Sequence, residues 1–483
     1  MEERGRLFVG GAWSAPSSDE VIEVVSPHSE AGIARVAAAG PADVDRAVAA
    51  ARAAFDHGPW PRLDPGERVA AIRRLAEGYG ARRKEMAQVI TSEMGAPISF
   101  ANFAQATLPK ILMSAFADLA AAYPWEERRP GYFGTDITVR KEPIGVVAAI
   151  VPWNMPQFLV VGKLVPALLA GCPIVVKPAP ETPLDALLLA EVVEEAGLPE
   201  GLVSILPGGR EVGELLVGHP GVDKVSFTGS TAVGRQIAAT CGADLRRVSL
   251  ELGGKSAAIV LDDADPEAVA QGVKVAGLMN SGQACVAQTR VLVPSSRYGE
   301  FVDALAAMVE DLVVGDPTDA ATEIGPLVAQ RQQARVRGYI EAGRREGARL
   351  VVGGTELPGT VERGWYVRPT LFADVDNRMQ IAREEIFGPV LSVIAHDGDD
   401  DAVGIANDSD YGLSGSVWTA DIERGLAAAR GVRAGSFGVN EPYSMDPAAP
   451  FGGMKASGIG RELGREGLEG YLETKAISVA AAP

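Results

Sequence analysis

Few residues of this chain suit metal sites or disulfide bonds. The 483 residues include only three cysteines, Cys172, Cys241 and Cys285, and four histidines. No two cysteines form a CxxC motif and no histidines form an HxxxH motif, which argues against a structural zinc site and a disulfide framework. Isolated cysteines are typical of a reducing compartment. We therefore predict a cytoplasmic protein that binds no metal.

Positive charge is also scarce. Lysine and arginine number 45 against 63 aspartates and glutamates, which gives a net charge of −18. Nucleic-acid binding relies on lysine and arginine to displace counterions. The composition therefore argues against nucleic acids and anionic membrane surfaces as partners.

Long hydrophobic runs are missing as well. The most apolar region, 144–176, is interrupted by Asn154, Gln157, Lys163 and several prolines, so we expect a buried core there and not a membrane span. The apolar stretch that follows residue 6 is too short for the core of a signal peptide. No G-x-S-x-G motif occurs, which leaves a serine hydrolase without support.

The chain does contain a regular alternation of strand-like and helix-like segments. Apolar runs at 144–151 and 173–177 are typical of parallel strands covered on both faces. A helix signal begins at Thr182, and a second series of strands and helices follows Leu250. This pattern predicts an α/β fold with two doubly wound domains.

Two segments do not fit this alternation. Residues 132–142 are polar, alternating and rich in β-formers, and the tail from 471 to 482 is also strand-like. A hairpin and a terminal strand of this kind can extend the sheet of a partner subunit. We therefore predict a small β oligomerisation element and a homodimer or homotetramer.

Cys285 has neighbours that the other cysteines lack. It follows Asn280-Ser-Gly-Gln-Ala, just after a predicted helix, where backbone N–H groups lower the pKa of a thiol. Upstream, Glu251 lies in an apolar strand before Gly253 and Gly254, and burying a carboxylate there is costly unless it has a task. Asn154 follows another buried strand and offers an amide at the strand's carboxyl end.

These residues belong to a set of motifs that resembles the aldehyde dehydrogenase superfamily over almost the whole chain. The motifs, in family order, are Pro152-Trp-Asn, Lys177-Pro, Phe227-Thr-Gly-Ser, Glu251-Leu-Gly-Gly-Lys, Gly282-Gln-Ala-Cys, Glu384-Glu-Ile-Phe-Gly-Pro and Pro450-Phe-Gly-Gly-Met-Lys-Ala-Ser-Gly. The resemblance implies a cofactor-binding domain of residues 1–122 and 145–252 and a catalytic domain of 253–445. Residues 123–144 and 469–483 then form the oligomerisation element, and 446–468 returns to the cofactor-binding side.

The resemblance also implies the chemistry. Cys285 attacks the aldehyde to give a thiohemiacetal, and Asn154 with the Cys285 N–H holds the oxyanion. Hydride loss to the cofactor leaves a thioester, which water activated by Glu251 hydrolyses. Lys163 and Glu384 are interpreted as structural or proton-relay positions.

The cofactor implied is NAD, with NADP as an open alternative. Ser230 stands at the start of a predicted helix, where a pyrophosphate can bind. Lys177 is expected at the adenosine ribose. Many NAD-preferring relatives carry glutamate three residues later, where this chain has Pro180. The full set of expected cofactor residues is Trp153, Lys177, Pro180, Gly229, Ser230, Gly253, Glu385 and Phe387.

A substrate tunnel is expected along the helix that follows Asn154. It carries no arginine that could pair with a distal carboxylate of a substrate. The expected lining residues are Met155, Leu159, Gly162, Met279, Tyr443 and Phe451, although they could instead only pack the core. An adaptable, apolar tunnel predicts neutral aldehydes of medium size.

Two alternative functions stay open. One is a CoA-acylating semialdehyde dehydrogenase, which needs no water-activating glutamate, so Glu251 favours hydrolysis. The other is a non-catalytic structural protein on the same fold, against which the presence of Cys285 argues.

Overall fold

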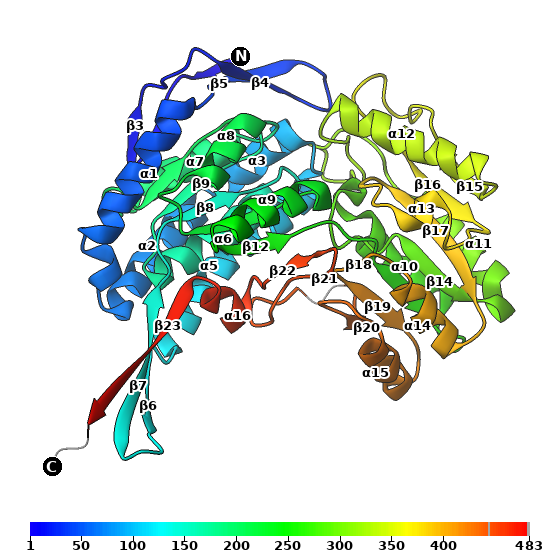
Figure 1. Ribbon diagram of the computed structural model, residues 1–483. Coiled ribbons are helices and arrows are strands. Elements are labelled where there is room, and N and C mark those ends of the chain that lie inside the picture. Colours follow the sequence, from blue (N-terminus) through cyan, green and yellow to red (C-terminus); the bar gives the residue numbers. More distant parts are fainter. Residues whose placement is uncertain (443–444, 481–483) are drawn as a thin grey trace.

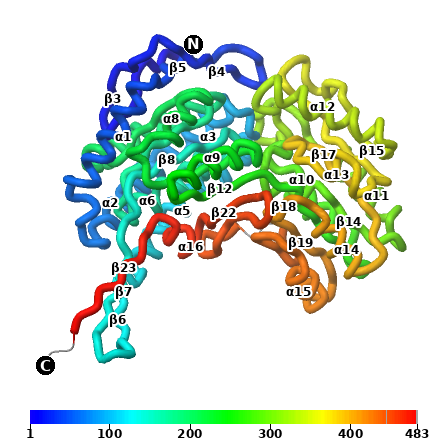
Figure 2. Tube along the Cα trace, in the orientation of Figure 1, coloured from blue at the N-terminus to red at the C-terminus, as the bar shows by residue number. Residues whose placement is uncertain are grey.

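Two twisted sheets with helices on both faces form the body of the molecule, and a narrow three-stranded sheet projects from it (Figure 1). The computed structural model describes residues 1–442 and 445–480. The Cα trace shows the same arrangement, with two lobes, one around each of the large sheets, and the projecting sheet (Figure 2). The predicted α/β fold with two doubly wound sheets is confirmed.

The first sheet has a parallel core of five strands with antiparallel strands at both edges. Its order is β22 (Gly458–Ile459), β12 (Arg247–Glu251), β11 (Lys224–Thr228), β8 (Val147–Ile150), β9 (Ile174–Lys177), β10 (Val203–Ile205), β2 (Leu7–Val9) and β3 (Ala12–Ser14). Strands β8, β9, β10 and β11 are buried along their whole length, as expected where helices cover both faces.

Alternate strand residues of this sheet enter two separate cores. One face carries α1 (Pro41–Asp56), α8 (Arg210–Gly218) and α9 (Thr231–Ala243). The other carries α2 (Pro65–Ala81), α3 (Arg83–Met94), α5 (Leu108–Ala122), α6 (Pro156–Ala170) and α7 (Leu184–Glu195). Helix α7 begins two residues after the predicted Thr182, and α10 (Pro266–Leu278) of the second sheet begins at the predicted Asp265 cap.

The second sheet is parallel except for its edge strand β15. Its order is β15 (Arg349–Gly354), β16 (Arg368–Ala373), β17 (Val390–His396), β14 (Arg290–Pro294), β13 (Ala257–Val260), β19 (Gly415–Trp418) and β20 (Gly438–Val439). Helices α10 and α11 (Tyr298–Glu310) cover one face. The other face carries α12 (Gln330–Arg345), α13 (Gln380–Arg383), α14 (Asp399–Asn407) and α15 (Ile422–Gly431).

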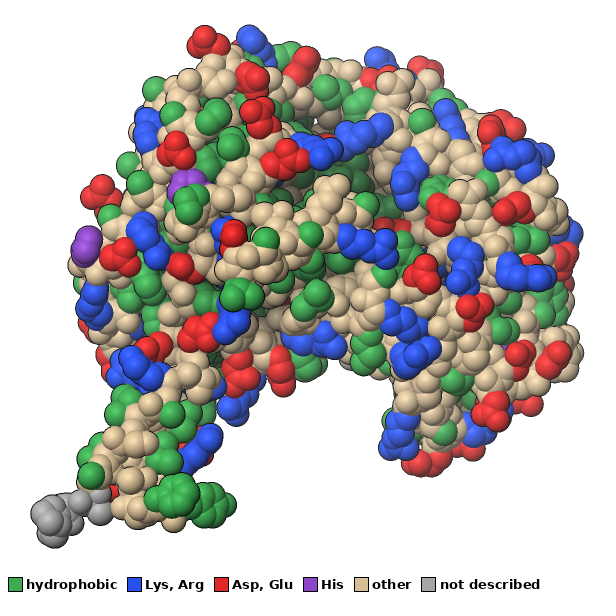
Figure 3. All heavy atoms as spheres, viewed as in Figure 1, with side chains coloured by type: hydrophobic (Ala, Val, Ile, Leu, Met, Phe, Trp, Pro, Cys, Tyr) green, Lys and Arg blue, Asp and Glu red, His purple; other side chains and the backbone are tan. Residues whose placement is uncertain are grey.

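The projecting sheet consists of β6 (Glu126–Pro130), β7 (Thr135–Pro143) and β23 (Leu472–Ala480). Strand β23 pairs with all nine residues of β7. The strand β6 was not predicted, and Tyr132, which we expected to begin a strand, lies in the turn between β6 and β7. Tyr132 and Phe133 at this turn are 103% and 96% exposed, and apolar side chains gather at the end of the projection (Figure 3).

Smaller elements complete the fold. A sheet of β1 (Glu2–Arg4), β5 (Gly32–Ala37) and β4 (Val21–Val25) was not predicted. The rest are β18 (Tyr411–Gly412) paired with β21 (Met454–Lys455), α16 (Gly464–Glu469), the short helices Trp60–Arg62, Ile98–Phe100, Met279–Gly282 and Ser295–Arg297, and the π-helix Ala101–Thr107. No described helix has the length and apolar character needed to cross a bilayer.

Candidate active site

Cys285 follows a tight turn in left-handed backbone. Asn280, Ser281 and Gly282 have φ values of 52°, 57° and 71°, which is costly for the serine. The Ser281 hydroxyl fixes the turn by donating to the carbonyl of Gly325 and accepting from its N–H, both at 3.0 Å. Met279, which we expected on a helix facing the tunnel, instead begins this turn, because α10 ends at Leu278.

Two glycines allow the Glu385 carboxylate and the backbone of Cys285 to lie close to the segment that follows Glu251. A Cβ at Gly253 would lie 2.6 Å from the Glu385 carboxylate, and a Cβ at Gly254 would lie 2.5 Å from the Cys285 carbonyl. The Gly254 N–H also donates to Glu385 Oε1 at 3.1 Å. Glycine is therefore required at positions 253 and 254, because any larger residue would clash with the Glu385 carboxylate or the Cys285 carbonyl.

The thiol of Cys285 is not acidified as we expected. Burial, followed by the charges of Glu385 and Glu251, raises the pKa of the Cys285 thiol to about 12. The N–H groups of Cys285 and Val286 lower the pKa, in the predicted direction, but their effect is smaller. The same burial raises the pKa of Glu385 to about 7. The thiolate therefore needs a base or an added positive charge.

Asn154 is buried next to the cysteine turn. Its side-chain amide donates to the Gln283 carbonyl at 3.0 Å, which leaves a second amide proton. The backbone carbonyl of Asn154 accepts hydrogen bonds from the side-chain amides of Gln105, at 2.9 Å, and Asn280, at 2.8 Å. Sequence reasoning missed Gln105, Asn280 and Gln283 as supports, because their role depends on contacts across 49 to 129 positions.

Glu251 ends β12 with its carboxylate buried. Neither oxygen has a hydrogen-bond partner among the described residues, and a Cβ at Gly452 would lie 2.6 Å from Oε1. Burial, followed by the charge of Glu462, raises the pKa of Glu251 well above its usual range, while Lys163 and Arg461 oppose the rise. A carboxylate with a raised pKa is a stronger base than an exposed one, which suits the removal of a proton from water.

A second buried carboxylate that we did not predict lies beside Glu251. The ammonium of Lys163 forms an ion pair with Glu462 and donates to the Thr228 hydroxyl at 2.7 Å. Lys163 is fully buried and Glu462 nearly so. No sequence signal links these residues, which are 299 positions apart.

The expected tunnel residues fall into three groups. Met155, Leu159 and Phe451 are buried in one apolar cluster, against which Met279 and Cys285 pack. A Cβ at Gly162 would point toward Glu462, at 3.8 Å, and Leu112, and its assignment to the tunnel stays a prediction. Tyr443 lies outside the described residues.

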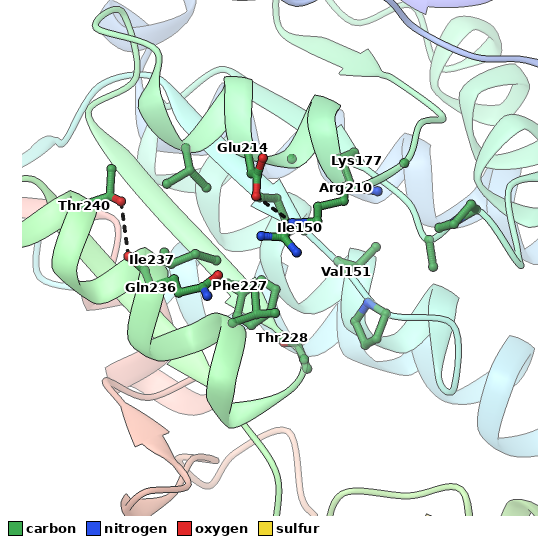
Figure 4. A pocket seen from close by; sticks show the side chains of 18 residues that line it. Ile150, Val151, Lys177, Arg210, Glu214, Phe227, Thr228, Gln236, Ile237 and Thr240 are labelled. Atoms are coloured by element: carbon green, nitrogen blue, oxygen red, sulfur yellow. Dashed lines mark hydrogen bonds and ion pairs between the residues drawn. The ribbon is translucent and has the colours of Figure 1, made fainter. Parts of the chain in front are cut away.

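A cavity of about 580 Å³ lies at the carboxyl ends of β8, β9 and β11, between α8 and α9 (Figure 4). Lys177, Pro180 and Gly229 line it, with apolar walls that include Val233 and Ile237. Ser230 caps α9 by accepting from the Val233 N–H at 3.4 Å. An apolar slot beside a helix N-terminus fits an adenosine and its pyrophosphate.

The remaining expected cofactor residues lie toward Cys285. Trp153 and Phe387 contact each other edge to face, with ring centroids 5.4 Å apart. Phe387 has φ of 64°, and the carbonyls of Ile386 and Phe387 accept from Gln332 at 3.4 and 2.8 Å. Glu385 accepts from the Gly254 N–H, and its charge acts on the Cys285 thiol. The expected cofactor residues are therefore found both at the cavity and near Cys285.

Known proteins resemble this chain over nearly its whole length. It is 47% identical, over 471 residues and 98% of both chains, to a geranial dehydrogenase of Castellaniella defragrans. A Mycobacterium tuberculosis aldehyde dehydrogenase complexed with NAD+ is 49% identical with a TM-score of 0.96, covering 99% of this chain and 98% of that one. A mutant of Pseudomonas syringae aldehyde dehydrogenase C, complexed with NAD+ and octanal, is 44% identical with a TM-score of 0.95, covering 98% and 96%.

The fold and these similarities define a nicotinamide-dependent oxidoreductase that acts on aldehyde groups. The model of the aldehyde dehydrogenase family matches residues 13–477. The chain belongs to the aldehyde dehydrogenase family, and it oxidises an aldehyde to a carboxylic acid with NAD(P).

Proposed function

We propose that Cys285 is the nucleophile of this oxidation. The deprotonated thiol adds to the aldehyde carbon, and the carbonyl oxygen becomes an oxyanion. The free amide proton of Asn154 and the Cys285 N–H stabilise that oxyanion. NAD(P)+, when held by the cofactor residues, would supply the acceptor for the hydride lost from the thiohemiacetal carbon. A thioester on Cys285 remains.

Glu251 is the base that completes the reaction. Its carboxylate takes a proton from water, the hydroxide adds to the thioester carbon, and the Cys285 thiolate leaves as the acid forms. The observation that carries this role is a buried carboxylate beside the thiol that forms no hydrogen bond with any residue the structure describes. The Lys163–Glu462 pair fixes the charge around it.

The residues that hold the cofactor are Lys177, Pro180, Gly229 and Ser230 at the adenosine and pyrophosphate, and Trp153, Gly253, Glu385 and Phe387 at the nicotinamide end. The NAD+ complexes of the two bacterial relatives support NAD as the preferred cofactor. Pro180 lines the cavity and carries no carboxylate to repel a 2′-phosphate, which supports NADP as a second cofactor.

The substrates are neutral, apolar aldehydes of medium size. This proposal is supported by the buried apolar cluster that contains Met155, Leu159 and Phe451 and against which Met279 and Cys285 pack, and by the names of two relatives, which mention geranial and octanal. A buried carboxylate without a partner would be costly in such a tunnel. We expect higher kcat/KM for hexanal, octanal or benzaldehyde than for succinic semialdehyde, measured by absorbance of the reduced cofactor. A preference for the charged substrate would contradict this assignment.

The protein is a cytoplasmic homodimer or homotetramer. The isolated cysteines support a reducing compartment. The exposed Tyr132 and Phe133 at the end of a sheet with a free edge support pairing with a second copy. Light scattering should give a mass of two or four chains, and Tyr132→Ser with Phe133→Ser should reduce it. A monomeric wild type would contradict this part of the proposal.

A further inference from the structure

An ion pair on α8 lines the cavity assigned to adenosine. Arg210 Nε donates to Glu214 Oε1 at 2.6 Å, one helical turn away. Both side chains reach into the cavity from the same helix (Figure 4). They are 80% and 61% exposed, so water screens their attraction and the pair is weak. Either partner can therefore exchange the other for a charged ligand.

The other charged groups at this end of the cavity are already engaged. The Lys177 ammonium donates to the carbonyls of Pro178 and Gly208, both at 2.7 Å, and burial lowers its pKa to about 8. Glu181, next to Pro180, forms an ion pair with Arg331 of α12. Among the 18 described residues that line the cavity, Glu214 supplies the only carboxylate and Arg210 the only exposed cation.

We propose that the Arg210–Glu214 pair determines how this chain discriminates NAD from NADP. This inference rests on the proposed binding of NAD(P) in this cavity. With NADP, the Arg210 guanidinium leaves Glu214 and binds the 2′-phosphate, for which its planar fork of donors is suited. Glu214, left without its partner, repels the same phosphate. With NAD, the pair stays intact and contributes little to affinity.

Two small ligands allow the effect of the 2′-phosphate on binding to be measured separately from catalysis. Adenosine 2′,5′-bisphosphate and 5′-AMP differ only in that phosphate, and calorimetric titration of the full chain measures their affinity without turnover. Arg210→Gln should lower the affinity for the bisphosphate about three- to tenfold and leave the affinity for 5′-AMP within about twofold of the wild-type value. Glu214→Gln should raise the affinity for the bisphosphate by a similar factor, again without changing the affinity for 5′-AMP.

A matched control is the Arg465–Glu469 pair of α16. It has the same spacing, with Arg465 Nε 2.9 Å from Glu469 Oε1, and it does not line the cavity. Arg465→Gln should change neither affinity. Equal changes for both ligands in the α8 variants, or no change, would overturn the proposal. If neither ligand binds the wild type, the assignment of the cavity to adenosine itself fails.

Discussion

The Arg210–Glu214 pair at the proposed adenosine end and the charged side chains at the proposed reaction end lie in opposite environments, one exposed and the other buried. At the adenosine end, Arg210 and Glu214 are exposed and satisfied by each other. At the reaction end, the Glu251 carboxylate is buried with no hydrogen-bond partner in the described part of the chain, and Lys163 and Glu462 are buried as a pair. A buried charge is destabilising unless it is compensated, whereas an exposed pair contributes little to stability. Substitutions at the reaction end should therefore affect chemistry and folding, and those at the adenosine end only ligand choice.

The largest effect is expected at the thiol. Cys285→Ala should abolish aldehyde oxidation, because no other group can form the thioester. Titration with NAD, followed by tryptophan fluorescence, should give an affinity within about twofold of the wild type, since the adenosine cavity is separate. Cys241→Ala, a buried cysteine of α9, is the control and should stay active. Substantial turnover by Cys285→Ala would remove Cys285 as the nucleophile.

Glu251→Gln should slow steady-state turnover about 10²- to 10⁴-fold, the usual value of a general base. If Glu251 acts mainly on the thioester, stopped-flow absorbance should show a burst of reduced cofactor before the slow phase. Equal loss of burst and steady state would mean that Glu251 also deprotonates Cys285. Unchanged rates in both phases would reject it as a base.

Lys163→Met tests the cost of the buried pair. It leaves the Glu462 carboxylate buried without its cation, which typically costs about 3–5 kcal/mol of unfolding free energy. Arg210→Gln at the exposed pair should change the same quantity by no more than about 0.5 kcal/mol. Urea unfolding followed by circular dichroism compares the two, and similar losses would contradict the contrast between the two ends.

Glu385 predicts a pH dependence of stability. Its pKa rises from 4.5 to about 7 in the folded chain, so its contribution to stability is complete below about pH 4.5 and is lost as the pH rises through 7. Without cofactor, Glu385→Gln should remove about 1–2 kcal/mol of the decline between pH 5 and 8, less than the full shift because the side chain is only partly buried. The exposed neighbour variant Glu384→Gln should keep the wild-type slope, and an unchanged slope in Glu385→Gln would reject this assignment.

The smallest effect is expected at Pro180. Pro180→Glu adds a carboxylate to the cavity wall and should raise the ratio of kcat/KM for NAD over NADP several-fold, through like-charge repulsion of the 2′-phosphate. Pro183→Glu, three residues further along and outside the residues that line the cavity, is the control. An unchanged ratio in Pro180→Glu would mean that position 180 does not approach the ribose.

The sequence was most informative where a short motif contains both the reactive group and the reason for its placement. Glu251 and Gly253-Gly254 are one such motif, because the glycines allow the contacts that bring Glu385 and Cys285 together. Glu462 could not be found this way, since it meets Lys163 only through the tertiary fold. The contacts of Gly162 with Glu462 and Leu112 could not be predicted either, because the direction of one helical position depends on packing. The Cys285 pKa was misjudged because burial and two distant carboxylates outweigh local N–H groups.

The pairing of β7 with β23 also orders events during synthesis. Lys141 of β7 bonds to Thr474 of β23, 333 positions later. At about 5–20 residues per second, a ribosome needs roughly 20 to 70 s to supply that partner. Until then the edge of β7 is open and Lys163 lacks Glu462. A nascent chain therefore completes its buried ion pair only after Glu462 and its third sheet strand only after residues 472–480 have been made, so a chain terminated before residue 462 lacks both.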